Sequence, residues 1–249
     1  MKLRYFSDIH LEFMKPNKII KFINKIKKGD PDEICILAGD IGNPYKYNYQ
    51  TFIEFINRSF QKTFIIAGNH EYYNKMKKIE ETDDYLREYF LKFNNISYLN
   101  NEYEIYNNYC FIGTTLWSHI TNSAYKICDL DQIPDFNIQQ YNQLNYHSIE
   151  FLNNAIKDNT NCIIITHHVP SFNLIDSKYK TIELMPYNQW FYSDLDNFIS
   201  LNRNKIRCWI YGHTHTSSYN VIYNIPFICN PIGYPNENKN LDFEKNIEL

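Results

Sequence analysis

Six short apolar runs, spread along most of the chain, constrain the fold more than any other feature of the sequence. They cover residues 3–8, 33–40, 62–70, 109–117, 161–168 and 207–215. Each run is rich in β-branched and aromatic residues and too short for a typical helix, so we expect each to form a strand. Segments between the earlier runs, around 18–29, 52–60 and 79–93, repeat apolar residues at helical spacing. This alternation predicts β-α-β units around a largely buried sheet.

The later part of the chain departs from this alternation. Residues 218–234 contain two β-type runs broken at 224–226, which predicts a hairpin. The stretch 119–157 is polar and irregular at first and then has helical spacing through Leu144, Ile149, Leu152 and Ile156. At about 118–157 we therefore expect either a lid-like insertion over a site or a plain surface excursion. Because no linker or repeat divides the chain, residues 1–249 are predicted to form a single domain.

The amino-acid composition narrows the classes of partner that the protein is expected to bind. The chain has 25 basic and 28 acidic residues, a balance that disfavours a nucleic acid partner. Six widely separated cysteines without a C-x-x-C pair are expected to be reduced and buried. Arg4 and Asp8 interrupt the apolar stretch that a signal peptide needs, and no run approaches the ~20 apolar residues of a membrane span. We expect a soluble, cytoplasmic protein with no membrane partner.

Side chains able to bind metal follow five of the six runs. The strand ends read Asp8-Ile9-His10, Gly39-Asp40, Gly68-Asn69-His70-Glu71, His167-His168 and Gly212-His213-Thr214-His215. Open α/β sheets place their sites at the carboxyl ends of strands, where loops converge. Each group has a plain structural explanation by itself, such as a turn at Asp40 or a helix cap at Asn69. Because all five occur at strand ends, we expect one shared site.

The residue types at these ends favour a centre with two metal ions. The candidate ligands are Asp8, His10, Asp40, Asn69, His167, His213 and His215. Seven ligands exceed the needs of one ion, whereas two ions about 3.5–4 Å apart, sharing a bridging carboxylate such as Asp40, use them well. Carboxylate, imidazole and amide donors without a thiolate suit Mn, Fe, Zn or Ni. Glycine precedes a candidate ligand at 39, 68 and 212, where a sharp turn lets an ion or phosphate approach.

In chain order, the segments D-I-H, G-D, G-N-H-E, T-H-H-x-P and G-H-T-H resemble the motifs of the calcineurin-like metallophosphoesterase superfamily, across nearly the whole sequence. The resemblance implies an α/β fold, a four-layer α-β-β-α sandwich of two mixed sheets flanked by helices. It also implies a division of ligands, with Asp8, His10 and His215 on one ion, Asn69, His167 and His213 on the other, and Asp40 bridging. His70 is implied to contact the substrate phosphate and to protonate the leaving group, with Asn69 fixing its geometry.

Two histidine pairs bear on this division. The family has a histidine ending the strand shortly before a proline, and this chain offers both His167 and His168. His167 follows the apolar run directly and is the preferred ligand, which would leave His168 near the substrate. His213 and His215 are two residues apart, so in extended chain their side chains share one face at roots roughly 6–7 Å apart. That separation suits two neighbouring ions.

We expect the protein to be a metal-dependent phosphoesterase. A hydroxide bridging two ions can attack phosphorus, and the ions neutralise the charge that develops on the phosphoryl oxygens. The ester could be a phosphomonoester or a phosphodiester, on a small molecule or on a phosphoprotein, because loops over the centre set that choice. The alternative is a non-catalytic, metal-binding scaffold for protein interaction on the same fold. His70 together with an intact ligand set favours the enzyme.

Overall fold

The strands form two sheets in the computed structural model, which describes residues 1–238 and 241–249. Their bounds are β1 Lys2–Phe6, β2 Glu33–Ala38, β3 Lys62–Ile66, β4 Ile96–Tyr98, β5 Glu102–Tyr106, β6 Tyr109–Thr114, β7 Cys162–Thr166, β8 Ile206–Ile210, β9 Ser218–Ile222, β10 Ile225–Cys229 and β11 Asn246–Glu248. One sheet has the order β11-β1-β2-β3-β4 and the other β5-β6-β7-β8-β10-β9. All six predicted strands are present, as β1, β2, β3, β6, β7 and β8.

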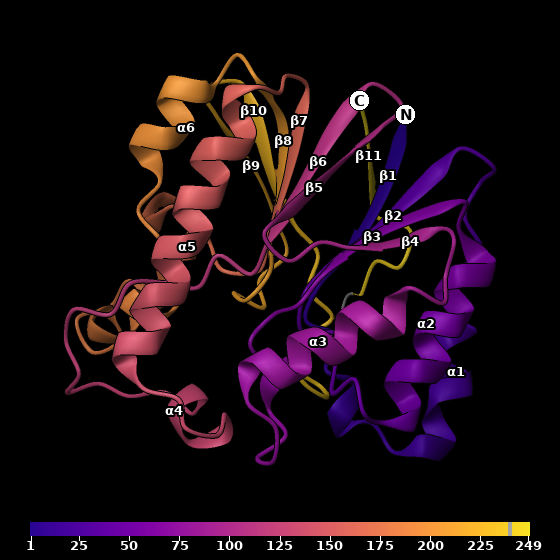
Figure 1. Cartoon of the computed structure of the whole chain (residues 1–249), viewed down its shortest axis with the longest axis horizontal. Coiled ribbons are helices and arrows are strands. Elements are labelled where there is room, and N and C mark those ends of the chain that lie inside the picture. Colours follow the sequence, from indigo (N-terminus) through magenta and orange to yellow (C-terminus); the bar gives the residue numbers. More distant parts are fainter. Residues whose placement is uncertain (239–240) are drawn as a thin grey trace.

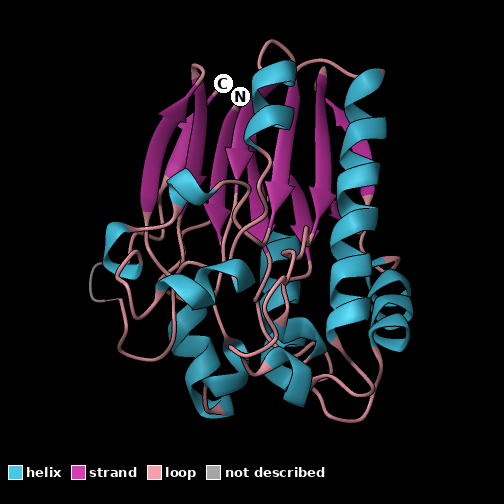
Figure 2. Ribbon diagram, turned by 90° about the vertical axis from the view of Figure 1, so that its left-hand side faces the viewer, coloured by secondary structure: helices cyan, strands magenta, loops and turns pink. Residues whose placement is uncertain are grey.

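Both sheets are mixed, with a parallel centre. Strands β1 to β4 run parallel in the first sheet, and β6, β7, β8 and β10 run parallel in the second. The antiparallel strands β11, β5 and β9 lie at sheet edges. Figure 2 shows the consequence: the parallel strands end on the same side of the molecule, where loops and short helices gather.

Helices cover the outer face of each sheet, as Figure 1 shows. Their bounds are α1 Ile19–Ile23, α2 Tyr47–Ser59, α3 Ile79–Phe90, α4 Asp129–Gln132, α5 Ile138–Lys157 and α6 Asp196–Asn202. One core cluster joins α1, α2 and α3 to the first sheet, and a second joins α5 and α6 to the other. A third lies between the sheets, where Phe64 of β3 stacks on Phe111 of β6 with ring centroids 4.0 Å apart. The layers are therefore α-β-β-α, as the family resemblance implied.

Several boundaries differ from the sequence predictions. The helix expected over 18–29 ends at Ile23, because the next N–H groups, of Lys25 and Ile26, donate to carbonyls three residues back and tighten the turn. Ile26 remains buried, but Ile20 is exposed. The predicted hairpin is confirmed as β9 and β10, with its turn at Tyr223 and Asn224, both of positive φ. The strands β4, β5 and β11 were not predicted.

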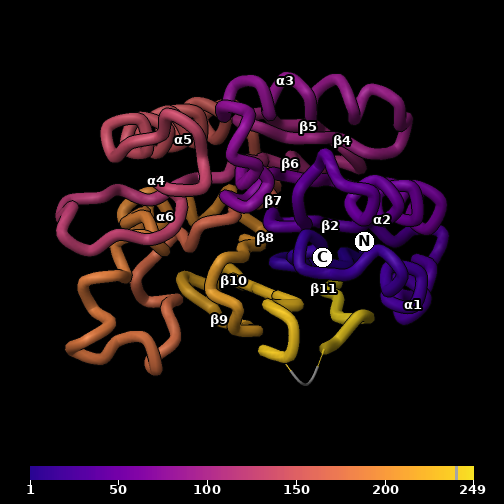
Figure 3. Tube along the Cα trace, turned by 90° about the horizontal axis from the view of Figure 1, so that it is seen from below, coloured from indigo at the N-terminus to yellow at the C-terminus, as the bar shows by residue number. Residues whose placement is uncertain are grey.

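The stretch 118–157 divides into two parts. Residues 138–157 form α5, whose first turn is capped by Asn137, and Leu152, Ala155 and Ile156 of this helix pack on the second sheet. The preceding residues lie with the loops at the carboxyl ends of the strands (Figure 3). A lid-like role stays a prediction, as does the single domain. Cys128 in this stretch is exposed, so the expectation that every cysteine is buried was wrong there. None of the described helices is long and apolar enough to span a membrane.

Candidate metal centre

The seven candidate ligands lie just beyond the carboxyl ends of five parallel strands, in both sheets. The first sheet supplies Asp8 and His10 after β1, Asp40 after β2 and Asn69 after β3; the second supplies His167 after β7 and His213 and His215 after β8. All are buried except His215, whose side chain is 11% exposed. The structure therefore brings the seven candidates together at the carboxyl ends of strands from both sheets.

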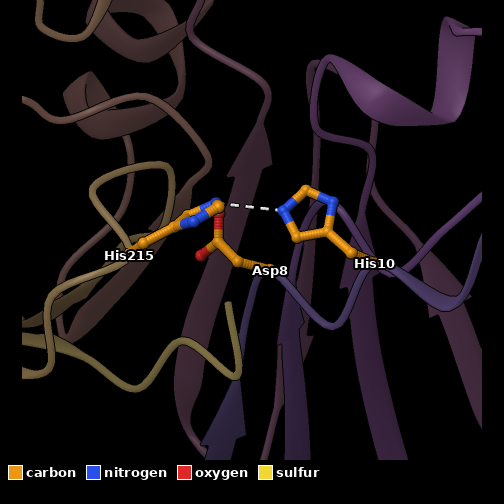
Figure 4. A group of neighbouring side chains, drawn as sticks. All are labelled: Asp8, His10 and His215. Carbon is orange, nitrogen blue, oxygen red and sulfur yellow. Dashed lines mark hydrogen bonds and ion pairs between the residues drawn. The ribbon is translucent and has the colours of Figure 1, made fainter. Parts of the chain in front are cut away.

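Asp8, His10 and His215 form one group of possible ligands (Figure 4). The Nε2 atoms of His10 and His215 lie 3.0 Å apart, and His215 Nε2 is 3.4 Å from Asp8 Oδ1. The other ring nitrogen of His215 donates to Glu237 Oε2 at 2.6 Å. That hydrogen bond fixes the tautomer and orientation of the ring, so the Nε2 lone pair is available for a cation.

Asp40, His167 and His213 form a second group. His167 Nδ1 donates to the Ala38 carbonyl at 2.9 Å, so Nε2 faces Asn69 Oδ1 at 3.1 Å and Asp40 Oδ2 at 3.3 Å. Of the two adjacent histidines, His167 is the one whose Nε2 atom lies close to the oxygens of Asn69 and Asp40. It is the better candidate ligand.

Asp40, a member of the second group, also lies near the first. Its Oδ2 atom is 3.3 Å from His167 Nε2 in one group and 3.8 Å from His10 Nε2 in the other. Its Oδ1 atom accepts the backbone N–H of His70 at 2.8 Å, which holds the carboxylate in place. One carboxylate thus reaches both groups.

Backbone strain is concentrated among these residues. Five of the seven candidate ligands have positive φ between 48° and 69°: Asp8, His10, Asp40, His213 and His215. This left-handed conformation disfavours residues with a Cβ, and such strain persists where the surroundings impose it, often at functional sites. Gly68 shows how tight the packing is, because a Cβ on it would lie 2.2 Å from Asp40 Oδ1.

The pKa values of several ionisable side chains in the centre are strongly shifted. Burial opposes ionisation of Asp40, but the imidazoles of His167 and His70 hold the pKa of its carboxyl well below the usual range. Burial opposes the charged form of His167 as well, yet the Asp40 carboxylate raises the pKa of this ring to about 10. Burial lowers the pKa of His213 far below its ordinary value. The carboxylates therefore retain protons on neighbouring imidazoles, and a metal ion would displace those protons on binding.

Comparison with known proteins identifies the family. A family model described as calcineurin-like phosphoesterase matches residues 1–217. The chain belongs to the calcineurin-like phosphoesterase family. Membership supports a metal-dependent hydrolase of phosphoesters in general terms, in agreement with the grouped histidines and aspartates.

Two kinds of relative accompany this match. Uncharacterized protein L509 of Acanthamoeba polyphaga mimivirus is 33% identical over 267 residues, which cover 96% of this chain and 94% of that protein. Phosphopantetheinyl hydrolase (PptH) from Mycobacterium tuberculosis is similar in structure, with a TM-score of 0.78 at 15% identity over 99% of this chain and 95% of that one. TT1561 of Thermus thermophilus has a TM-score of 0.58 at 10% identity, over 92% and 88% of the two chains. At these identities the solved structures show a shared fold.

His70 of this phosphoesterase lines the cavity beside the ligand groups. Its Nδ1 donates to Glu12 Oε1 at 2.9 Å, and its Nε2 lies 3.3 Å from the Tyr234 hydroxyl. Glu12 Oε1 also accepts from His10 Nδ1 at 3.0 Å, so one carboxylate orients both rings. Sequence reasoning missed Glu12. Its position two residues after His10 was the one available signal, and a solvated acidic residue would give the same signal.

Asp129 is a second residue that sequence reasoning missed. It is fully buried in α4, and its Oδ1 accepts from Asn69 Nδ2 at 2.9 Å and from the Tyr73 hydroxyl. Holding the amide nitrogen in this way turns Asn69 Oδ1 toward His167 Nε2. No local pattern could have revealed this contact, because it joins residues 60 positions apart.

His168 was predicted to lie near the substrate. It is fully buried: Nδ1 donates to the Thr115 carbonyl at 3.2 Å, and Nε2 accepts from the Tyr141 hydroxyl at 3.0 Å. Its ring packs on that of His213, with centroids 4.2 Å apart. Both nitrogens are occupied and no atom of the ring reaches solvent, so this geometry does not support a contact with substrate. The geometry favours a packing role for His168 against the ring of His213.

Proposed function

We propose that this phosphoesterase hydrolyses phosphomonoesters or phosphodiesters at a centre of two divalent or trivalent metal ions. The observation that carries the proposal is the pair of ligand groups, with the Asp40 carboxylate of one group close to His10 of the other. Manganese, iron, zinc or nickel would suit the carboxylate, imidazole and amide donors. Such ions, when bound, supply charge stabilisation for the phosphoryl oxygens and make water nucleophilic near neutral pH.

The candidate ligands suit a pair of metal ions, both in the types of donor atom that they offer and in the hydrogen bonds that orient them. Asp8, His10 and His215 would hold one ion, and Asn69, His167 and His213 the other. Glu237 orients His215, the Ala38 carbonyl orients His167 and Asp129 orients Asn69, each through a hydrogen bond to the side chain. Support of this kind is typical of metal-ligating residues.

His70 would act on the substrate itself. Because Glu12 accepts the hydrogen bond from Nδ1–H, His70 presents Nε2 toward the cavity and the Tyr234 hydroxyl. Burial opposes protonation, but the nearby carboxylates of Asp40 and Glu12 raise the pKa of this ring above its ordinary value. A protonated Nε2 at this place can donate to the phosphate and then to the leaving oxygen. Asn69 contributes by fixing the backbone from which His70 extends.

A metal reconstitution experiment tests the proposal. Chelator-treated protein is supplied in turn with Mn, Fe, Ni or Zn, and hydrolysis of an aryl phosphate monoester and of a bis-aryl phosphodiester is measured. We expect turnover of at least one ester with at least one metal, and anomalous scattering should count two ions. Stable metal binding without turnover of either ester would favour the alternative, a non-catalytic metal-binding scaffold for protein interaction.

A further inference from the structure

We propose that the organic group of this enzyme's substrate is uncharged and largely apolar, and that it binds along one wall of the cavity beside the metal centre. The inference rests on the proposed function and narrows its substrate class. The wall, here called the apolar wall, consists of Ile127, Ile175, Tyr179, Leu184, Tyr187 and Phe191.

The cavity is far larger than a phosphate group requires. Its volume is about 460 Å³, within the range of about 300–1,000 Å³ that is common for sites of drug-sized ligands. Four candidate ligands, Asp40, Asn69, His213 and His215, line the cavity together with His70 and the apolar wall. A phosphoester bound through its phosphate at the centre would therefore direct its organic group against the apolar wall.

The apolar wall is held in shape by contacts between two loops. Gln189 of the loop after β7 accepts the backbone N–H groups of Thr121 and Asn122 at 2.9 Å and donates to the Asn122 carbonyl, also at 2.9 Å. The indole of Trp190 donates to the Tyr125 carbonyl at 2.7 Å. Figure 3 shows these loops side by side, coloured pink and orange. These hydrogen bonds hold the two loops together at the apolar wall.

The apolar wall adjoins the candidate ligands directly. The ring of Phe191 packs on that of His213 with centroids 4.8 Å apart. A group attached to a phosphate at the metal centre would meet this aromatic surface, and Leu184 and Ile127 of the same wall would add aliphatic contacts. Burial of alkyl or aromatic groups there would be favourable in proportion to the apolar area removed from water.

The charges that line the cavity disfavour a second anionic group on the substrate. Among the described residues that line it, none is lysine or arginine. The nearby Lys178 and Lys180 lie over the rings of Tyr179 and Phe172, at 4.8 and 4.5 Å from the centroids. A second phosphate or a carboxylate against the wall would lose water without gaining an opposite charge. Esters with further phosphate groups, such as nucleoside diphosphates and triphosphates, are therefore disfavoured.

Apart from Asp40, a candidate ligand, the carboxylates among the described residues that line the cavity are Asp129 and Glu237, and both are already hydrogen-bonded to candidate ligands. Asp129 accepts from Asn69 and Tyr73 through Oδ1, and its Oδ2, which has no hydrogen-bond partner among the described residues, is buried from solvent. Glu237 accepts from His215 Nδ1 and, at 2.8 Å, from the backbone N–H of Tyr234. Neither residue belongs to the apolar wall. The apolar wall remains neutral, which selects an uncharged group.

Binding of alkylphosphonates tests the inference, because each probe carries a single organic group. The dissociation constants of methylphosphonate, hexylphosphonate and 6-phosphonohexanoate for the metal-loaded protein are measured by calorimetry. We expect hexylphosphonate to bind at least tenfold more tightly than methylphosphonate, and the terminal carboxylate to abolish that gain. Equal affinities, or no binding of any probe, would overturn the inference.

Hydrolysis of methyl and hexyl 4-nitrophenyl phosphate, measured alongside, separates this inference from the proposed function. If neither diester nor an aryl monoester is hydrolysed, the proposed function fails, while the phosphonate comparison still decides the inference. If both diesters are hydrolysed but the phosphonates bind equally, the enzyme stands and the substrate class proposed here is wrong.

A matched pair of variants locates the effect on the apolar wall. Leu184 lines the cavity, whereas Ile182, two residues earlier in the same loop, does not line it and is 95% exposed. Leu184→Arg should remove most of the preference for hexylphosphonate over methylphosphonate and improve binding of 6-phosphonohexanoate. Ile182→Arg should leave all three affinities within about twofold. Identical behaviour of the two variants would contradict binding along this wall.

Discussion

Side chains that hydrogen-bond to the candidate ligands orient them in the centre. Glu12 contacts two imidazoles, Asp129 orients the Asn69 amide, and Glu237 orients His215. The ligands themselves could be predicted from sequence, because each follows an apolar run and their types share one chemistry. The supporting residues could not, since an isolated acidic residue has no pattern and its partner lies far away along the chain.

Replacement of His70 should separate metal binding from catalysis. His70→Ala removes the proposed proton donor but none of the candidate ligands, so we expect full metal content and a fall in kcat of about 10²- to 10⁴-fold. The loss should be greatest for esters with a poor leaving group. His147→Ala, which changes an exposed histidine of α5, is the control. Loss of metal from His70→Ala would show that its role has been misassigned.

Replacement of Asp129 tests the support of Asn69. In Asp129→Asn the acceptor for the Asn69 amide is weakened, and we expect affinity for metal to fall by about 10- to 100-fold, as for other residues that orient ligands. Asp131→Asn is a matched control, because Asp131 lies in the same helix and is exposed. Metal titration of both variants by calorimetry is the measurement. Equal affinities would mean that Asn69 needs no such support.

At the scale of elements, the sequence predicted the strands that carry the centre and missed others. Strands β1, β2, β3, β7 and β8 are buried apolar runs, which are recognisable without further information. β4 and β11 have three residues each, and β5 includes Glu102 and Glu104 and is half-exposed. These segments are strands because each pairs with a neighbouring strand, and no local sequence pattern reports that pairing. The loop after β7 was likewise unpredicted, although it supplies most of the apolar wall.

A buried ion pair joins the first two strands. Arg4 of β1 donates to both carboxylate oxygens of Glu33 at the start of β2, at 3.1 and 2.6 Å, and Glu33 is fully buried. Among the described residues, Arg4→Leu would leave that carboxylate with Lys2 at 3.4 Å as its remaining cationic neighbour. We expect a loss of about 3 kcal/mol in the free energy of unfolding, measured with urea.

The control for this prediction is Arg87→Leu. Arg87 pairs with Glu102, but the two side chains are 43% and 45% exposed, so the change should be below about 1 kcal/mol. Similar losses in the two variants would indicate that the Arg4–Glu33 pair gives the first sheet no particular stability.

At the scale of the whole molecule, the centre joins the two sheets. Asp8 and His10 from the first sheet would share an ion with His215 from the second, and Asn69 from the first would share the other ion with His167 and His213. The four layers are otherwise held by three separate apolar clusters. Metal binding should therefore stabilise the arrangement of one sheet against the other, in addition to providing the chemistry.

Removal of metal should accordingly lower the thermal stability of the protein. An ion that binds only the folded state at 100 times its Kd contributes about 2.7 kcal/mol. For a chain of this length each kcal/mol shifts Tm by about 2–4 °C, so we expect Tm to fall by roughly 5–10 °C on chelation and to recover with Mn. Asp40→Asn, which alters the carboxylate that reaches both groups, should lose most of this shift, whereas Asp131→Asn should keep it. Metal binding detected by calorimetry with no change in Tm would contradict a centre that links the two sheets in the folded state.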